Sequence, residues 1–197
     1  MTLLLKLSQL IDALNERVGR AAFWLVLAMT IICAGNAVVR FAFNYSSNGL
    51  LEIQWYLFAA VFLLCAAYTL QKNEHVRIDV VAGRFSPKGQ AVIDIIGTLF
   101  FLLPMVVLVL SLSIPLVKES FHIGEMSANA GGLIRWPVKA LLPIGFTLLA
   151  LQGVSELIKR IAFLAGRIDD PNAKAKGPSA EEELAAAIAA TKAKEDK

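Results

Sequence analysis

Four long apolar runs constrain the fold of this chain more than any other feature of its sequence. They occupy residues of about 21–43, 53–70, 91–117 and 137–160, and charges are rare inside them. A helix rises about 1.5 Å per residue, so each run is long enough to cross the roughly 30 Å of hydrocarbon in a bilayer. Together with 57% hydrophobic residues overall, these runs predict an all-α integral membrane protein with four transmembrane helices.

The segments on either side of these runs are more polar and divide the chain into three parts. In residues 1–20, polar side chains occupy much of the expected helix surface. Five apolar residues recur there at helical spacing: Leu7, Leu10, Ile11, Leu14 and Val18. This pattern predicts an amphipathic helix that lies along the cytoplasmic membrane surface or docks on a partner. Residues 21–165 form the transmembrane domain, and residues 166–197 are expected to be a mobile cytoplasmic tail.

Lysine and arginine are distributed unequally between the two sides of the predicted bundle. The side that carries both ends of the chain has Lys6, Arg17, Arg20, Lys72, Arg77, Arg84, Lys88, Lys159, Arg160 and Arg167 in its flanks. The opposite side has Arg40, Lys118, Arg135 and Lys139. Since cytoplasmic flanks carry the excess of these cations, both termini are predicted to lie in the cytoplasm.

The sequence offers little material for catalysis or for holding a cofactor. Its two histidines, His75 and His122, fall in predicted loops on opposite sides of the membrane, whereas a membrane haem commonly needs axial histidines inside the spans. ATPase, zinc-protease and nucleophile-elbow motifs are all missing from the sequence, and no basic run is interleaved with aromatics as nucleic-acid binding would require. We therefore expect no enzyme activity, no cofactor, no metal and no nucleic-acid partner.

Polar groups inside the predicted spans are also few. Asn36 and Gln152 are expected to form hydrogen bonds between helices, which is the commoner role of such residues. Asp94 and Glu156 lie near the cytoplasmic ends of their spans, where headgroups and water are expected to reach them. The sequence therefore predicts that any transport pathway runs through another chain.

Two motifs carry a resemblance to a known family. The second run opens with Leu-Glu-Ile-Gln-Trp-Tyr-Leu-Phe at residues 51–58, and Glu-His-Val-Arg-Ile-Asp-Val follows it at residues 74–80. These motifs and their spacing resemble the small membrane subunit of tripartite ATP-independent periplasmic (TRAP) transporters, the DctQ family, over about residues 20–165. The segment Gly-Glu-Met-Ser-Ala-Asn-Ala-Gly-Gly at residues 124–132 is similar to one branch of that family.

The resemblance implies a scaffold subunit in a bacterial inner membrane. It would brace a large multi-span subunit, which carries an organic acid, commonly a carboxylate, inward by symport with sodium after a periplasmic binding protein delivers it. The chain's partners would then be that large subunit in a heterodimer, the binding protein transiently, and membrane lipid. A membrane anchor of a redox complex and an independent small transporter are the alternatives.

Nine residues are candidates for contacts with these partners. Glu52, Gln54 and Trp55 at the start of the second run are expected either to place the helix end or to contact the large subunit. His75, Arg77 and Asp79 either fix the shape of their loop or bind the same partner. On the opposite loop, His122, Glu125 and Arg135 are candidates for docking the periplasmic protein, although a plain connector explains that loop equally well.

Overall fold

The computed structural model describes residues 2–45, 47–73 and 85–169, and this part of the chain is almost entirely helical. The helices are α1 (Thr2–Phe43), α2 (Asn48–Lys72), α4 (Pro87–Gly97), α5 (Leu103–His122) and α6 (Trp136–Leu164), with a π-helical turn, η1 (Thr98–Leu102), between α4 and α5. Within this part of the chain, four helical stretches are long and apolar enough to cross a membrane: α1, α2, α6 and the stretch from α4 through α5. The predicted all-α class and its four membrane-length helices are confirmed. The expected tail lies almost wholly outside the described residues.

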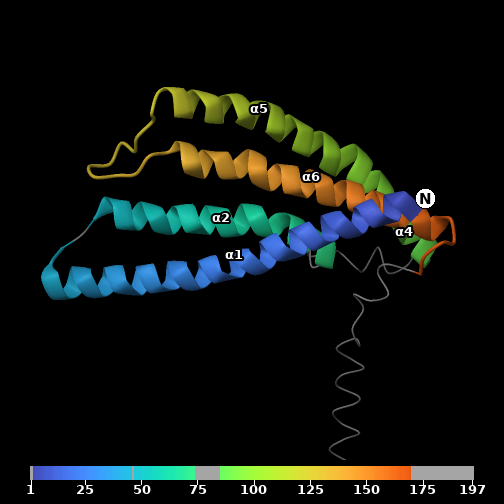
Figure 1. Ribbon diagram of the computed structural model, residues 1–197, viewed down its shortest axis with the longest axis horizontal. Coiled ribbons are helices and arrows are strands. Elements are labelled where there is room, and N and C mark those ends of the chain that lie inside the picture. Colours follow the sequence, from blue (N-terminus) through green and yellow to red (C-terminus); the bar gives the residue numbers. More distant parts are fainter. Residues whose placement is uncertain (1, 46, 74–84, 170–197) are drawn as a thin grey trace, which may run out of the picture.

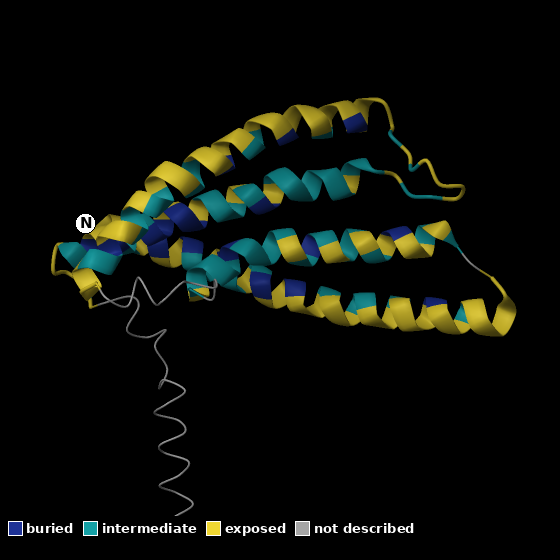
Figure 2. Ribbon diagram, turned by 180° about the vertical axis from the view of Figure 1, so that it is seen from behind, coloured by how far each residue is buried: buried dark blue, intermediate teal, exposed yellow. Residues whose placement is uncertain are grey.

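These helices lie side by side in one layer. Figures 1 and 2 show the order α1, α2, α6, α5 across the layer, and neighbouring helices in this order pack on each other. The beginning of α1 also crosses over to contact α6 near the end where α6 finishes. A single layer has two open faces, and most side chains of the four stretches are therefore exposed or half-buried (Figure 2).

Small residues allow the helices of this layer to approach closely. The buried apolar residues are mainly alanines: Ala22, Ala60, Ala67, Ala91 and Ala162. A Cβ added at Gly145 of α6 would lie 2.7 Å from the carbonyl oxygen of Leu63 in α2, and one added at Gly19 of α1 would lie 2.6 Å from the ring of Tyr68. Without a hydrophobic force between helices in lipid, such close packing is a main source of helix association.

The first helix differs from its sequence-based description. Residues 2–43 form a single continuous helix, so the expected amphipathic helix and the first span have no break between them at residue 20. The polar side chains Ser8 and Asn15 do not face water but are buried, whereas Leu3 and Leu10 are largely exposed. The periodicity is sufficient to identify a two-faced helix, but a polar face can pack on a polar partner as readily as on water.

The third stretch contains a π-helical irregularity next to its proline. We expect Pro104 to disturb the helix, because its ring clashes with the carbonyl four residues earlier and it lacks an N–H donor. In the structure the five-residue π-helical turn ends at Leu102, and Pro104 lies at the start of α5. The widened turn accommodates the proline while the stretch continues, and it arches over α6 in Figure 1.

Candidate functional site

Glu52 is the centre of a cluster that holds the loop between α5 and α6 against the beginning of α2. Its carboxylate accepts hydrogen bonds from the Asn129 amide at 2.8 Å, from the backbone N–H of Leu133 at 2.7 Å and from the Ser127 hydroxyl. The side chain is only 4% exposed although it lies in the first turns of its helix. We call Glu52, Ser127, Asn129 and Leu133 the loop clasp.

The loop has an ordered conformation of its own around this clasp. Its two arms are joined at the bridge between Met126 and Ile134. The N–H of Ser127 donates to the carbonyl of Leu133 at 2.9 Å, and the N–H of Arg135 donates to that of Glu125 at 2.9 Å. In addition, Asn48 and Tyr56 of α2 donate to the carbonyls of Ala130 and Ile134, respectively. The loop is thus a structured cap on α2, and its contact with a periplasmic protein stays a prediction.

A glycine is required inside the clasp. A Cβ built on Gly132 would lie 2.4 Å from the Cβ of Ser127 and 2.9 Å from a carboxylate oxygen of Glu52. Neither distance is compatible with a real side chain, so this position has room only for hydrogen. In the sequence, Gly131 and Gly132 are only a turn signal. The structure shows that Gly132 also has a packing role.

The other two candidates at the start of α2 face a groove. Gln54 donates to the carbonyl of Leu50 within its own helix, and Trp55 is 66% exposed. Both line a groove of about 510 Å³ between α1 and α2, together with Met29, Cys33 and Phe58 and others. Trp55 is consequently accessible to a partner, whereas Glu52 beside it is occupied by the chain's own loop.

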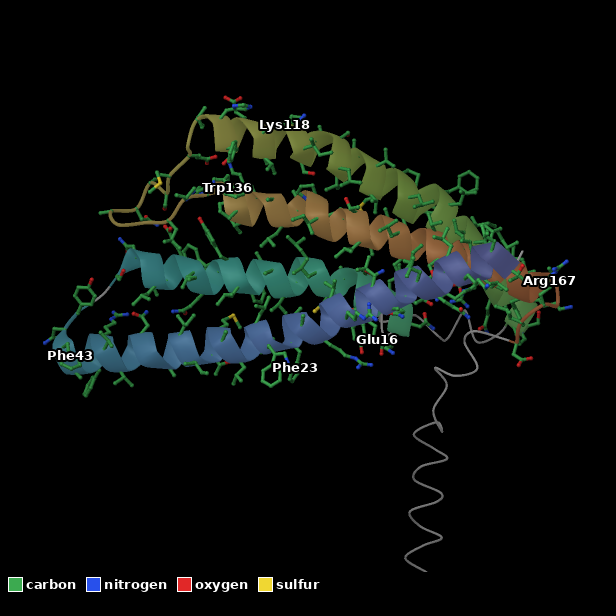
Figure 3. All side chains as sticks on the ribbon, viewed as in Figure 1. Glu16, Phe23, Phe43, Lys118, Trp136 and Arg167 are labelled. Atoms are coloured by element: carbon green, nitrogen blue, oxygen red, sulfur yellow. The ribbon has the colours of Figure 1, made fainter. Side chains whose placement is uncertain are left out.

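The three candidates for periplasmic docking have different surroundings. Glu125 is half-buried and forms an ion pair with Lys139 at the start of α6. His122 is exposed and its ring lies near that of Phe121, which in turn packs edge-on against Trp136 (labelled in Figure 3). Arg135 is exposed to an intermediate degree. The remaining candidates, His75, Arg77 and Asp79, lie outside the described residues.

The hydrogen bond with Lys139 lowers the pKa of Glu125 below its ordinary range. Because the folded pKa is lowered, the ionised carboxylate stabilises the loop above the ordinary value of about 4.3, and this stabilisation is lost as the pH falls through the lower folded pKa. We expect hydrogen exchange of residues 124–135, corrected for its intrinsic pH dependence, to be unchanged from pH 7 to pH 5 and to accelerate only in more acidic solution. The variant Glu125→Gln should show a smaller acid-dependent step, because the carboxylate of Glu52 also holds this loop and still becomes protonated in acid. A step of the same size in that variant would contradict the assignment.

A second polar cluster joins α1 to α6 at the opposite end of the layer. We call it the α1–α6 network, and its members are Ser8, Asp12, Asn15, Gln152, Ser155, Glu156 and Lys159. The Gln152 amide accepts from Asn15 at 2.7 Å and donates to Asp12 at 2.9 Å. Ser155 donates to Asp12 at 2.8 Å.

The sequence predicts this network only in part. The expected interhelical hydrogen bonds of Gln152 are confirmed, but the Oδ1 atom of Asn36 has no partner among the described residues. Glu156 is 8% exposed and accepts a hydrogen bond from Lys159, so the expectation that it is open to headgroups and water is wrong. The available signal is the recurrence of polar residues every three or four positions on both helices, which places them on one face of each.

Membrane-length helices and these two polar clusters define a small multi-pass membrane protein. Among the described residues, no group of histidine, cysteine, aspartate and glutamate side chains is arranged to hold a metal ion. Residues 29–163 match the family model described as the DctQ component of tripartite ATP-independent periplasmic transporters. The chain therefore belongs to the DctQ family, whose members are non-enzymatic small permease subunits of TRAP transporters.

A curated relative points to the same family. A TRAP transporter small permease protein of Haemophilus influenzae is 28% identical over 90 residues, which cover 46% of this chain. The match spans 56% of the length of that relative, a little more than half.

Proposed function

We propose that this chain is a scaffold that braces the large multi-span subunit of a TRAP-type secondary transporter. The observation that carries the proposal is the single layer of membrane-length helices. A layer that buries mainly alanines and glycines between its helices leaves large apolar faces for a second membrane protein to cover. The polar groups at membrane depth support this function, because Gln152 and Glu156 already bind other residues of the chain.

The remaining elements of the proposal come from the family. The large subunit would carry an organic acid, with a carboxylate as the substrate class that we favour, inward by symport with sodium. A periplasmic binding protein would deliver it, contacting the capped loop of residues 123–135. The chain would lie in a bacterial inner membrane with both termini in the cytoplasm, as the distribution of lysine and arginine in the flanks predicts.

Two tryptophans of nearly equal exposure provide a direct test of the scaffold function. Trp55 and Trp24 are 66% and 67% exposed, but Trp55 lies on α2 beside the groove and Trp24 lies on α1 outside it. A tryptophan at the centre of an interface often contributes at least about 2 kcal/mol to binding. Trp55→Ala is therefore expected to weaken binding of the large subunit by about thirtyfold or more, whereas Trp24→Ala should not.

The measurement is affinity purification of the tagged chain in mild detergent with quantification of the co-purified large subunit. Wild type is expected to bring down a stoichiometric multi-span partner without a visible-absorbing cofactor. Recovery of the chain alone in several detergents would overturn the scaffold proposal. A bound haem would instead favour the redox-anchor alternative, and flux in liposomes containing this chain alone would favour an independent transporter.

A further inference from the structure

The groove beside Trp55 has an outer continuation toward the free end of α1. The outer part has a volume of about 520 Å³ and the inner part about 510 Å³. The two parts share three lining residues: Cys33, Ala37 and Gln54. They therefore form one groove between α1 and α2, which we call the α1–α2 groove. On the α1 side it extends from Met29 to Asn44, about 22 Å at the rise of a helix, which is long enough to receive about four turns of another helix.

The two walls of the α1–α2 groove differ in shape. The α1 wall of the inner part carries small side chains at helical spacing, apart from Met29: Thr30, Cys33, Ala34 and Ala37. The α2 wall carries two exposed aromatic rings, those of Trp55 and Phe58. Small residues allow a neighbouring helix to approach closely in lipid, where packing contacts replace the hydrophobic force. The α1 wall is therefore suited to close contact with another helix.

Asn36 adds a polar group without a partner to the outer part of this groove. Its side chain is only 8% exposed and lines the groove. The Oδ1 atom is enclosed without a hydrogen-bond donor, and the amide nitrogen has no acceptor among the described residues. Asparagine in a membrane helix ordinarily forms a hydrogen bond to a neighbouring helix, and an unmade bond is costly there. An acceptor for this amide nitrogen is therefore expected on another chain.

Arg40 supplies an independent observation one helical turn away. It is the only charged residue of α1 beyond Arg20, and its exposed side chain lines the outer part of the groove. No carboxylate among the described residues lies within ion-pair distance of it, and no acidic residue lines either part of the groove. Residues four positions apart share one face of a helix, so Arg40 and Asn36 can meet the same acceptor. The charge of Arg40 makes a carboxylate the complementary group.

We propose that the α1–α2 groove seats one transmembrane helix of the large subunit, and that this helix carries a carboxylate which pairs with Arg40 and accepts a hydrogen bond from Asn36. The inference rests on the proposed scaffold function and assigns the place and the chemistry of the contact. The small side chains of α1 let the partner helix approach, and the rings of Trp55 and Phe58 pack along its side. The interhelical hydrogen bond expected of Asn36 is then made between two chains.

Photo-crosslinking of the assembled complex tests the place of the contact. Phe58 lines the groove and is 61% exposed, whereas Phe23 is 71% exposed on α1 and points away from α2 (labelled in Figure 3). Benzoylphenylalanine replaces one or the other in the full chain, which is co-expressed with the large subunit, illuminated and analysed by mass spectrometry. The crosslink to the large subunit is expected to form at least tenfold more at Phe58 than at Phe23.

The outcomes of this experiment separate the groove from the scaffold function. If the large subunit co-purifies but position 58 crosslinks only to lipid, or no more than position 23 does, the groove assignment is wrong and the scaffold function stands. If no large subunit co-purifies in any detergent, the scaffold function itself fails, and the groove assignment with it.

Three variants test the chemistry of the contact by competition with untagged wild type for a limited amount of large subunit. Arg40→Glu places like charges together and is expected to compete at least tenfold less well, whereas Lys118→Glu reverses an exposed charge on α5 and should compete equally. Asn36→Leu should compete about threefold less well without a lower melting temperature of the isolated chain, because this amide bonds to no described residue. Equal competition by Arg40→Glu and Lys118→Glu, or a lower melting temperature of Asn36→Leu, would overturn the proposal.

Discussion

Replacing Gln152 by leucine is expected to destabilise the chain more than any other single loss of a side-chain amide. Gln152 is fully buried in α6 and binds Asn15 and Asp12 of α1 as well as Glu156 of its own helix. Leucine has a similar volume but leaves these polar partners without their central group. Hydrogen bonds between helices in membranes average about 0.6 kcal/mol each, and unsatisfied buried partners add to the cost, so we expect a loss of about 2–3 kcal/mol in the free energy of unfolding.

This loss should be measurable as a lower melting temperature of the purified chain in detergent. For a protein of this size about 1 kcal/mol corresponds to roughly 2–4 °C, so the expected decrease is on the order of 4–12 °C. Thr147→Val is the matched control, because its exposed hydroxyl donates only to the carbonyl of Pro143 in the same helix. If Gln152→Leu unfolds at the same temperature as this control, the α1–α6 network does not hold the two helices together.

The four membrane-length helices could be predicted from the sequence because their signal is local. An apolar run of sufficient length enters the lipid, where the backbone must satisfy its own hydrogen bonds and therefore forms a helix. The same run is directly visible in the sequence. The arrangement of the helices in one layer has no such local signal. It depends on which alanines and glycines meet, as Gly145 meets Leu63 in a different helix.

The candidate site could be identified only in part for the same reason. Glu52 stands out as a carboxylate at the start of an apolar run, where the helix amino terminus favours negative charge. Its partners Ser127, Asn129 and Leu133 are 75–81 residues further along the chain, so only the path of the loop shows that they meet it. Glu52 therefore binds the chain's own loop, whereas contact between Trp55 and a partner stays a prediction.

The α1–α6 network shows a limit of amphipathic patterns as evidence. The pattern places Asp12 and Asn15 on the surface, because polar residues opposite leucines usually face water. Residues on α6, at a separation of 137 to 147 positions, offer them polar partners instead. The same pattern therefore describes a helix on a membrane surface and a helix whose polar face packs on another polar face, and only the fold distinguishes them.

Adding one methyl group at Gly132 is expected to disrupt the loop clasp. The Cβ of alanine would lie 2.4 Å from the Cβ of Ser127. The Ser127 Cβ is bonded directly to the backbone, so it cannot move away unless the backbone moves with it. The loop must therefore shift and its hydrogen bonds to Glu52 must lengthen, with an overpacking cost of about 1–3 kcal/mol. Gly132→Ala should lower the melting temperature by roughly 2–12 °C and should accelerate hydrogen exchange in residues 124–135.

Ala130→Val adds bulk at an exposed position two residues away in the same loop and is the matched control. It should leave both the melting temperature and the exchange rates close to those of wild type. If the loop is the surface that meets a periplasmic binding protein, Gly132→Ala should also weaken that contact while binding of the large subunit through α2 persists. Unchanged exchange in Gly132→Ala would show that the loop tolerates the shift and that its hydrogen bonds to Glu52 do not determine its conformation.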